Sequence, residues 1–170
     1  MNKIKKIYIA SPYGFSEAGR VFLYEKLLPA IEETGFVCID PWKLTQENLI
    51  TDVLSITDAD KKKNEWCKLN RIIAANNSNA IKMSDCMIAV LDGTDVDSGT
   101  ASEIGYAAAL NKKICGYRGD FRKSGDNEGS IINLQVEYFI LNSGGKIVFS
   151  LQDLKTELKK IFQRLTGLSE

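Results

Sequence analysis

Apolar residues along this chain form short runs that alternate with longer segments of helical periodicity. The runs predict five strands, at residues 4–10, 36–39, 86–91, 113–117 and 146–149. The longer segments predict five helices, at residues 16–34, 64–83, 100–111, 131–141 and 151–165. Residues 44–63 are polar and only weakly periodic, and they predict no element.

Three residues mark the limits and the shape of the first predicted helix. Ser16 suits the N-cap position and Gly35 suits the stop after the last turn. Pro29 lies inside the helix, where it removes a backbone donor and crowds the preceding turn. We therefore expect a helix that is bent or interrupted near Pro29.

Strands that alternate with helices indicate parallel pairing and right-handed crossovers. The run at residues 86–91 is apolar throughout, as expected of a strand that is covered on both faces. The chain is thus predicted to be an α/β domain spanning residues 1–170, with a flavodoxin-like, doubly wound, five-stranded parallel sheet of order 2-1-3-4-5 and helices on both faces. In that arrangement a ligand binds beyond the carboxyl ends of the first and third strands, at residues 10–16 and 92–100.

Charge and hydropathy argue against several partners. The 22 Lys and Arg residues balance the 22 Asp and Glu residues, and no run of like charge is longer than residues 61–63. The basic patch that is typical of proteins binding nucleic acid or anionic membranes is therefore missing. The apolar runs are far shorter than the roughly 20 residues that cross a bilayer. We expect a cytoplasmic protein with a small-molecule partner and no contact with nucleic acid or membrane.

Two residue types narrow the possible chemistry. The chain has no histidine, which excludes Ser-His triads, His-ligated zinc and His general bases. Its four cysteines show no C-x-x-C spacing, and we expect buried, reduced thiols. Catalysis must then use carboxylates, hydroxyls, amines or thiols.

Acidic residues gather where the third strand gives way to the next helix: Asp92, Asp95, Asp97 and Glu103. Stability alone gives no reason to concentrate negative charge there, so the cluster is a candidate metal site or carboxylate catalytic site. The spacing does not match a calcium-binding loop, and no G-x-G-x-x-G or Walker pattern supports a dinucleotide or ATP.

The same residues also have simpler interpretations. Glu103 stands three residues after Thr100, so the two can form a capping box in the first turn of the helix. Gly99 with Thr100 is either an ordinary helix start or a site for an anion or a ligand hydroxyl. Asp92 can cap a turn, and Asp95 is interpreted as surface charge.

Two further groups of residues are open to two interpretations. Tyr8 is either a core residue or, with Tyr13 and Phe15, part of an aromatic wall that also carries a phenol. The Asn-rich segment 76–79 lowers helix propensity, and it is either a helix end or a polar site.

Three segments, in the same order, resemble the nucleoside 2-deoxyribosyltransferase family. They are residues 7–12 (YIASP with the preceding Ile), 77–85, and 97–107, which reads DSGTASEIGYA. The pattern D-x-G-T-x-x-E-x-G-x-A is specific in this context, and the resemblance covers essentially the whole chain. It implies a flavodoxin-like fold, no metal or cofactor, transfer of 2-deoxyribose between nucleobases, and homo-oligomers whose subunits share active sites.

The resemblance also implies roles for individual residues. Glu103 matches the nucleophile that forms a covalent deoxyribosyl ester, and Tyr8 matches the tyrosine that orients it. Asp97 matches the acid that binds the sugar 5′-hydroxyl, and Asn133 matches a residue that is lent to a neighbouring subunit. The remaining candidate substrate-binding residues are Ser11, Tyr13, Phe15, Asn77, Asp92 and Gly99.

Two positions decide between branches of the family. Relatives that hydrolyse deoxynucleoside 5′-monophosphates carry serine at the position of Asp97, because a carboxylate there would repel the phosphate. Asp97 thus favours a free nucleoside. Many members carry aspartate at the position of Asn77, where it protonates the leaving base; an amide cannot do so, which leaves Asp92 or water as the proton donor.

The sequence therefore favours base exchange on a free 2′-deoxynucleoside through Glu103. A 2′-deoxynucleoside 5′-monophosphate N-glycosidase is the alternative enzyme. A ligand-binding module without catalysis is the alternative outside the enzymes.

Overall fold

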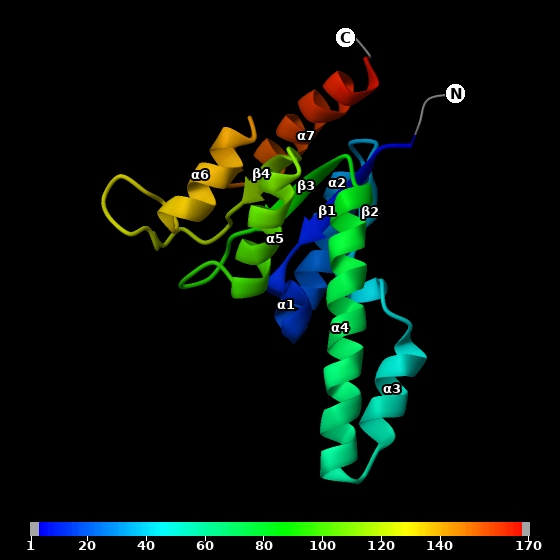
Figure 1. Cartoon of the computed structure of the whole chain (residues 1–170). Helices are drawn as coiled ribbons and strands as arrows, with labels where there is room; N and C mark the ends of the chain where they lie inside the picture. Colours follow the sequence, from blue (N-terminus) through cyan, green and yellow to red (C-terminus); the bar gives the residue numbers. More distant parts are fainter. Residues whose placement is uncertain (1–3, 168–170) are drawn as a thin grey trace.

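The sheet has five parallel strands, and the computed structural model describes residues 4–167 (Figure 1). In chain order the strands are β1 (Lys6–Ala10), β2 (Val37–Ile39), β3 (Cys86–Val90), β4 (Lys113–Tyr117) and β5 (Ile147–Val148). They lie side by side in the order β2-β1-β3-β4-β5. This confirms the predicted doubly wound topology, and its switch point lies between β1 and β3.

Helices cover both faces of the sheet, as predicted. The helical segment made of α1 (Glu17–Phe22) and α2 (Leu28–Glu32) packs with α7 (Leu151–Thr166) on one face. On the other face lie α4 (Ala59–Met83), α5 (Ser98–Ala109) and α6 (Leu134–Asn142).

Strand alternation decides which face each residue of β1 joins. Ile7 and Ile9 enter the core against α1, α2 and α7, whereas Tyr8 and Ala10 face α4 and α5. All five residues of β3 are buried, because helices cover that central strand on both sides. Tyr8 is therefore held between two neighbouring strands, with Met87 of β3 as its register partner.

The first helical segment is interrupted as predicted. Ser16 accepts a hydrogen bond from the Gly19 amide and is the N-cap, and Gly35 has a φ of 98° beyond the last turn. Residues 23–27 between α1 and α2 form a wider π-helical turn, and Pro29 is the second residue of α2. The wider turn accommodates the missing donor and the bulk of the proline ring.

Residues 44–63, for which the sequence predicted no element, contain one helix and the start of another. Residues 47–55 form α3 (Glu47–Ser55), and α4 begins at Ala59 rather than at residue 64 because the Asp58 side chain caps it. The two helices pack together and extend away from the sheet (Figure 1). Residues 76–79 lie inside α4, so the interpretation of this segment as a helix end is wrong.

The remaining predicted boundaries shift by a few residues. Helix α6 begins at Leu134 instead of 131, because the Asn133 side chain accepts hydrogen bonds at its start. Cys86 and Cys115 are buried and Cys38 is half-buried, but Cys67 is exposed on α4, so the expectation of burial is wrong for that thiol. Within residues 4–167, no helix is long and apolar enough to cross a membrane.

Candidate active site

The centre of the site is a hydrogen bond between β1 and α5. The Tyr8 side chain is completely buried on the α5 side of the sheet, and its hydroxyl donates to Glu103 Oε1 over 2.6 Å. Burial, followed by the charge of Glu103, raises the pKa of Tyr8 far above its usual value. The phenol therefore keeps its proton and remains a donor to the carboxylate, so Tyr8 serves both the core and the site.

Glu103 does not cap its helix, which corrects one interpretation of the sequence. Helix α5 begins at Ser98, and its N-cap is Asp97, whose Oδ2 accepts from the Thr100 amide over 2.9 Å. Glu103 thus lies beyond the first turn, and the Thr100–Glu103 capping box is wrong. Ile104, the next residue, packs into the core, whereas the Glu103 side chain faces Tyr8 and α4.

A second donor reaches the same oxygen of Glu103. Asn77 Nδ2, on α4, lies 3.4 Å from Glu103 Oε1, so this oxygen accepts from both a phenol and an amide. No described residue donates to Oε2. One carboxylate oxygen is therefore held in place, and the other has no described hydrogen-bond partner.

Burial raises the pKa of Glu103 above its ordinary value. The hydrogen bond from Tyr8 opposes this rise in the pKa, the charge of Asp97 adds to it, and the hydrogen bond from Asn77 opposes it more weakly. A carboxylate that is partly stripped of water is a stronger nucleophile than a solvated one, and this environment is typical of functional carboxyl groups.

Glu103 opens into a pocket of about 390 Å³ at the carboxyl end of the sheet. This volume is in the range that accommodates small ligands. Six predicted site residues line the pocket: Ser11, Phe15, Asn77, Asp97, Gly99 and Glu103. The described lining residues include neither Lys nor Arg, so the charged groups around the pocket are the carboxylates of Asp97 and Glu103.

An apolar wall faces these polar groups. The rings of Phe15 and Trp42 meet edge to face with centroids 4.6 Å apart, and Phe15 remains 75% exposed. Trp42 Nε1 donates to the Ser11 carbonyl over 3.3 Å, which fixes the indole over the loop that follows β1. Such a wall suits a flat, aromatic group such as a nucleobase.

One carboxylate oxygen of Asp97 caps helix α5, and the other has no described hydrogen-bond partner. Its Oδ2 accepts from the amide of Thr100 and, over 3.2 Å, from the Thr100 hydroxyl. No described residue donates to Oδ1, and Asp97 lines the pocket. Gly99 leaves room beside the carboxylate, since a Cβ at that position would lie 3.1 Å from Asp97 Oδ2. A ligand hydroxyl is thus a suitable partner for the free oxygen.

A family model described as nucleoside 2-deoxyribosyltransferase matches residues 7–135, which is more than half of the chain. The chain belongs to this family. A search of curated proteins gives no match.

Solved structures share this fold. A conserved protein from Enterococcus faecalis V583 is 24% identical, with a TM-score of 0.69 over 94% of this chain and 99% of that one. A 2-desoxiribosyltransferase from Leishmania mexicana is 26% identical, with a TM-score of 0.51 over 78% and 85% of the two chains. A 2-deoxyribosyltransferase from Bacillus psychrosaccharolyticus is 22% identical, with a TM-score of 0.61 over 88% and 90%. The sheet order is thus that of the nucleoside deoxyribosyltransferase fold.

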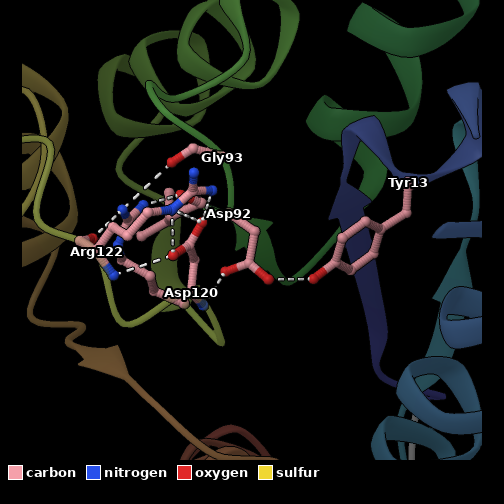
Figure 2. A network of polar contacts seen from close by, with 7 residues as sticks. Tyr13, Asp92, Gly93, Asp120 and Arg122 are labelled. Carbon is pink, nitrogen blue, oxygen red and sulfur yellow. Dashed lines mark hydrogen bonds and ion pairs between the residues drawn. The ribbon is translucent and has the colours of Figure 1, made fainter. Parts of the chain in front are cut away.

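The range that matches the nucleoside 2-deoxyribosyltransferase model contains all the predicted site residues, from Tyr8 to Asn133. Four of them lie outside the described pocket: Tyr8, which reaches Glu103 from the sheet, and Tyr13, Asp92 and Asn133. The Tyr13 hydroxyl donates to Asp92 Oδ2, and Asp92 Oδ1 accepts from the Asp120 amide over 2.9 Å (Figure 2). Asn133 caps α6, with its Oδ1 accepting from the amides of Gln135 and Val136. Asp95 is exposed, as predicted for surface charge.

Four residues that line the pocket were not predicted from the sequence: Pro41, Trp42, Asn70 and Ile73. The loop after β2 also ends at the carboxyl edge of the sheet, so chain order could have drawn attention to Pro41 and Trp42. Asn70 and Ile73 precede Asn77 by seven and four residues on α4, and helical spacing places them on the same side. Only the packing of α4 brings that side to the pocket.

A second hollow of about 250 Å³ lies between α4 and α5 and shares Asn77, Gly99 and Glu103 with the pocket. Glu103 is therefore reached from two sides of the α4–α5 contact. Within residues 4–167, no group of three Cys, Asp or Glu residues is placed to hold a metal ion.

Proposed function

We propose that this member of the nucleoside 2-deoxyribosyltransferase family exchanges the nucleobase of a free 2′-deoxynucleoside through a covalent deoxyribosyl ester on Glu103. The observation that carries this proposal is the state of the Glu103 carboxylate. Its Oε1 accepts from Tyr8 and Asn77, its Oε2 has no described donor, and the side chain lines the pocket. This is the arrangement that a positioned nucleophile requires.

The proposed reaction has two displacements. Glu103 Oε2 attacks the anomeric carbon, the bond from that carbon to the base nitrogen breaks, and the base leaves with the electron pair. A second base then attacks the same carbon with its ring nitrogen, the proton on that nitrogen passes to water, the ester bond breaks, and the Glu103 carboxylate is restored. Two inversions give net retention of configuration, as in a retaining glycosidase.

Two features of the pocket support one orientation of the substrate, with the base at the aromatic pair and the sugar 5′-hydroxyl at Asp97. The edge-to-face pair of Phe15 and Trp42 suits the nucleobase, and the free Oδ1 of Asp97 suits the 5′-hydroxyl. Glu103 lines the same pocket as these groups, and the anomeric carbon is the atom that joins base and sugar. The substrate would thus span the pocket with its reactive carbon over Glu103.

Asp97 supports a free nucleoside over a 5′-monophosphate. Two like charges about 4 Å apart repel by roughly 1 kcal/mol in water and by roughly 4 kcal/mol at an intermediate effective dielectric. The described lining supplies no cation that would offset this repulsion. A phosphate would also bring a second charge close to Glu103.

The leaving base takes its proton from water in this proposal. Asn77 carries no acidic proton, and the Tyr8 phenol is committed to Glu103. Asp92 is outside the pocket, with one oxygen bound to Tyr13 and the other to the Asp120 amide. Bases that carry a basic ring nitrogen should then leave most readily, because they accept the proton before the bond breaks.

We also propose that the chain works as a homo-oligomer in which Asn133 completes the sugar site of a neighbouring subunit. Asn133 is absent from the pocket of its own subunit, and its Oδ1 is engaged at the start of α6. Its Nδ2 has no described acceptor and would be the group that is lent.

The deciding experiment is incubation with deoxyinosine or thymidine and a panel of free bases, followed by chromatography. Exchanged nucleosides that disappear in Glu103→Gln would support the proposal. Free deoxyribose without any exchange product would favour hydrolysis. A Glu103→Ala variant that retained the measurable function of the protein would point instead to a binding module.

A further inference from the structure

Asp92 joins three loops that follow three different strands. Its Oδ2 accepts from the hydroxyl of Tyr13, in the loop after β1, and its Oδ1 accepts from the amide of Asp120, in the loop after β4 (Figure 2). Asp92 itself follows β3. Both carboxylate oxygens are thus used to fix neighbouring loops at the carboxyl edge of the sheet, and neither lines the described pocket.

A buried guanidinium holds the backbone around Asp92. Arg118 is only 1% exposed, and it donates to the carbonyls of Leu91 and Gly93, the two residues that flank Asp92. A third bond, of 2.5 Å, reaches the carbonyl of Arg122. None of the described ion pairs includes Arg118. Burying a guanidinium without a carboxylate partner is costly, so stability alone does not explain an arginine here.

Tyr13 connects this network to the apolar wall of the pocket. It lies in a short 3-10 helix, Pro12–Phe15, which has Ser11 as its N-cap and ends at Phe15. The backbone of Gly14 packs directly under Trp42, since an added Cβ there would lie 2.0 Å from the indole. The position of this turn therefore sets the position of Ser11, Phe15 and Trp42.

On the other side, the loop from Asp92 leads into Asp97 and α5. The Tyr13–Asp92 hydrogen bond thus ties the turn that carries the aromatic wall to the loop that carries Asp97. Tyr8, Asn77 and Glu103 are held separately, by β1, α4 and α5. Loss of the tie should loosen the spacing across the pocket without moving the nucleophile.

We infer that Tyr13, Asp92 and Arg118 are positioning residues, which set the distance between the aromatic wall and the Asp97 side of the pocket without touching the substrate. The kinetic consequence of this inference rests on the base exchange proposed above. Tyr13 and Asp92 would then contribute through each other, and the changes Tyr13→Phe and Asp92→Asn should not be additive. Direct contact of either residue with the substrate predicts separate and additive effects.

The kinetic arm measures base exchange for Tyr13→Phe, Asp92→Asn and the double variant. Each should raise KM about tenfold with little change in kcat, because binding is weakened equally in the ground state and the transition state. The double variant should match the single ones. Tyr138→Phe, on the exposed side of α6, is the matched control and should leave both constants unchanged. Additive effects, or a loss of kcat with KM unchanged, would overturn the inference.

The second arm needs no activity. The indole N–H resonance of Trp42 reports on the turn, because this group donates to the Ser11 carbonyl. It is assigned by comparison with Trp66→Phe. In the free protein, Tyr13→Phe and Asp92→Asn should shift it, and Arg118→Met should do so more strongly than Arg118→Lys. An unchanged Trp42 resonance in Tyr13→Phe would refute the inference, even if the wild-type protein exchanged no base; a missing exchange activity with shifted resonances would refute only the proposed function.

Discussion

The hydroxyl of Tyr8 donates to Glu103 Oε1 over 2.6 Å, and this bond joins β1, an inner strand of the sheet, to helix α5. It places a neutral, proton-bearing phenol under a carboxylate that has lost much of its water. The bond therefore fixes the direction of the carboxylate and favours its charged form.

Tyr8→Phe should lower kcat by roughly tenfold to a hundredfold, the range expected when a hydrogen bond to a charged group is lost. The reason is that Oε1 would keep only the longer contact with Asn77. Steady-state base exchange measures the change in kcat. A Tyr8→Phe variant with wild-type kcat would show that Tyr8 does not orient the nucleophile.

The pH profile of Tyr8→Phe should change as well. The hydrogen bond from Tyr8 lowers the pKa of Glu103, so its removal should raise that pKa further above the ordinary value. Attack needs the carboxylate, which exists above its pKa. The acidic limb of kcat/KM should consequently move to higher pH in the variant, and a shift to lower pH, or none, would contradict the assigned cause.

Asn77→Asp should restore a proton donor next to the leaving base. The new carboxyl would lie close to Glu103 Oε1, and repulsion between like charges would raise its pKa and keep part of it protonated. General acid catalysis is typically worth 10²–10⁴-fold, and we expect a gain of at least about tenfold in kcat below neutral pH. The gain should be largest for bases that leave poorly. Matched pH profiles of the two proteins with thymidine test this, and equal profiles would remove the need for an acid at this position.

The doubly wound sheet could be predicted because the patterns that indicate its strands and helices are local in the sequence. Each strand is a short apolar run, and its alternation with helices restricts the topology to few choices. The same pattern failed for α3, which is only nine residues long and packs mainly on α4 away from the sheet. The start of α5 was misplaced because Thr100 looks like a cap, whereas the true cap is Asp97.

The position of the candidate site could be predicted from chain order, but its contacts depend on packing between distant segments. Glu103 could be proposed as a nucleophile from its motif, whereas the choice between its two oxygens requires the positions of Tyr8 and Asn77. Tyr13 was expected to bind substrate because it lies beside the switch point. Its partner Asp92 is 79 residues away in the chain, and no local pattern reveals that pair.

Asp97→Ser should relax the discrimination against a 5′-phosphate. Serine also caps helices well, so α5 should still begin at the same place and the protein should fold. The KM for a free deoxynucleoside should rise, because the free Oδ1 that would bind the 5′-hydroxyl is lost, and the use of a deoxynucleoside 5′-monophosphate should improve. Asp95→Ser is the matched control, since Asp95 is exposed two residues away. Parallel kinetics on the two substrates provide the measurement, and the phosphate-repulsion argument fails if Asp97→Ser changes neither preference.

Glu103→Gln should abolish base exchange without lowering stability at neutral or higher pH. Burial raises the pKa of Glu103 in the folded state above its value in the unfolded chain. A carboxyl group whose pKa is higher in the folded state makes its most favourable contribution to the free energy of unfolding at pH values below its unfolded pKa. This contribution is lost as the pH rises through the folded pKa. The charged Glu103 therefore opposes folding at pH 8, and the neutral amide removes that effect while keeping the shape.

The difference in the free energy of unfolding between Glu103→Gln and the wild-type protein should shrink as the pH falls. Denaturant unfolding at pH 8 should give Glu103→Gln a free energy of unfolding equal to or greater than that of the wild-type protein, and this relative advantage should shrink as the pH is lowered and Glu103 becomes protonated in both states. Glu128→Gln, at an exposed loop position, is the control and should show no such trend. An advantage of the variant that grew toward acid would mean that the carboxylate stabilises the fold. A carboxylate that costs stability when charged is the expected sign of a residue kept for chemistry.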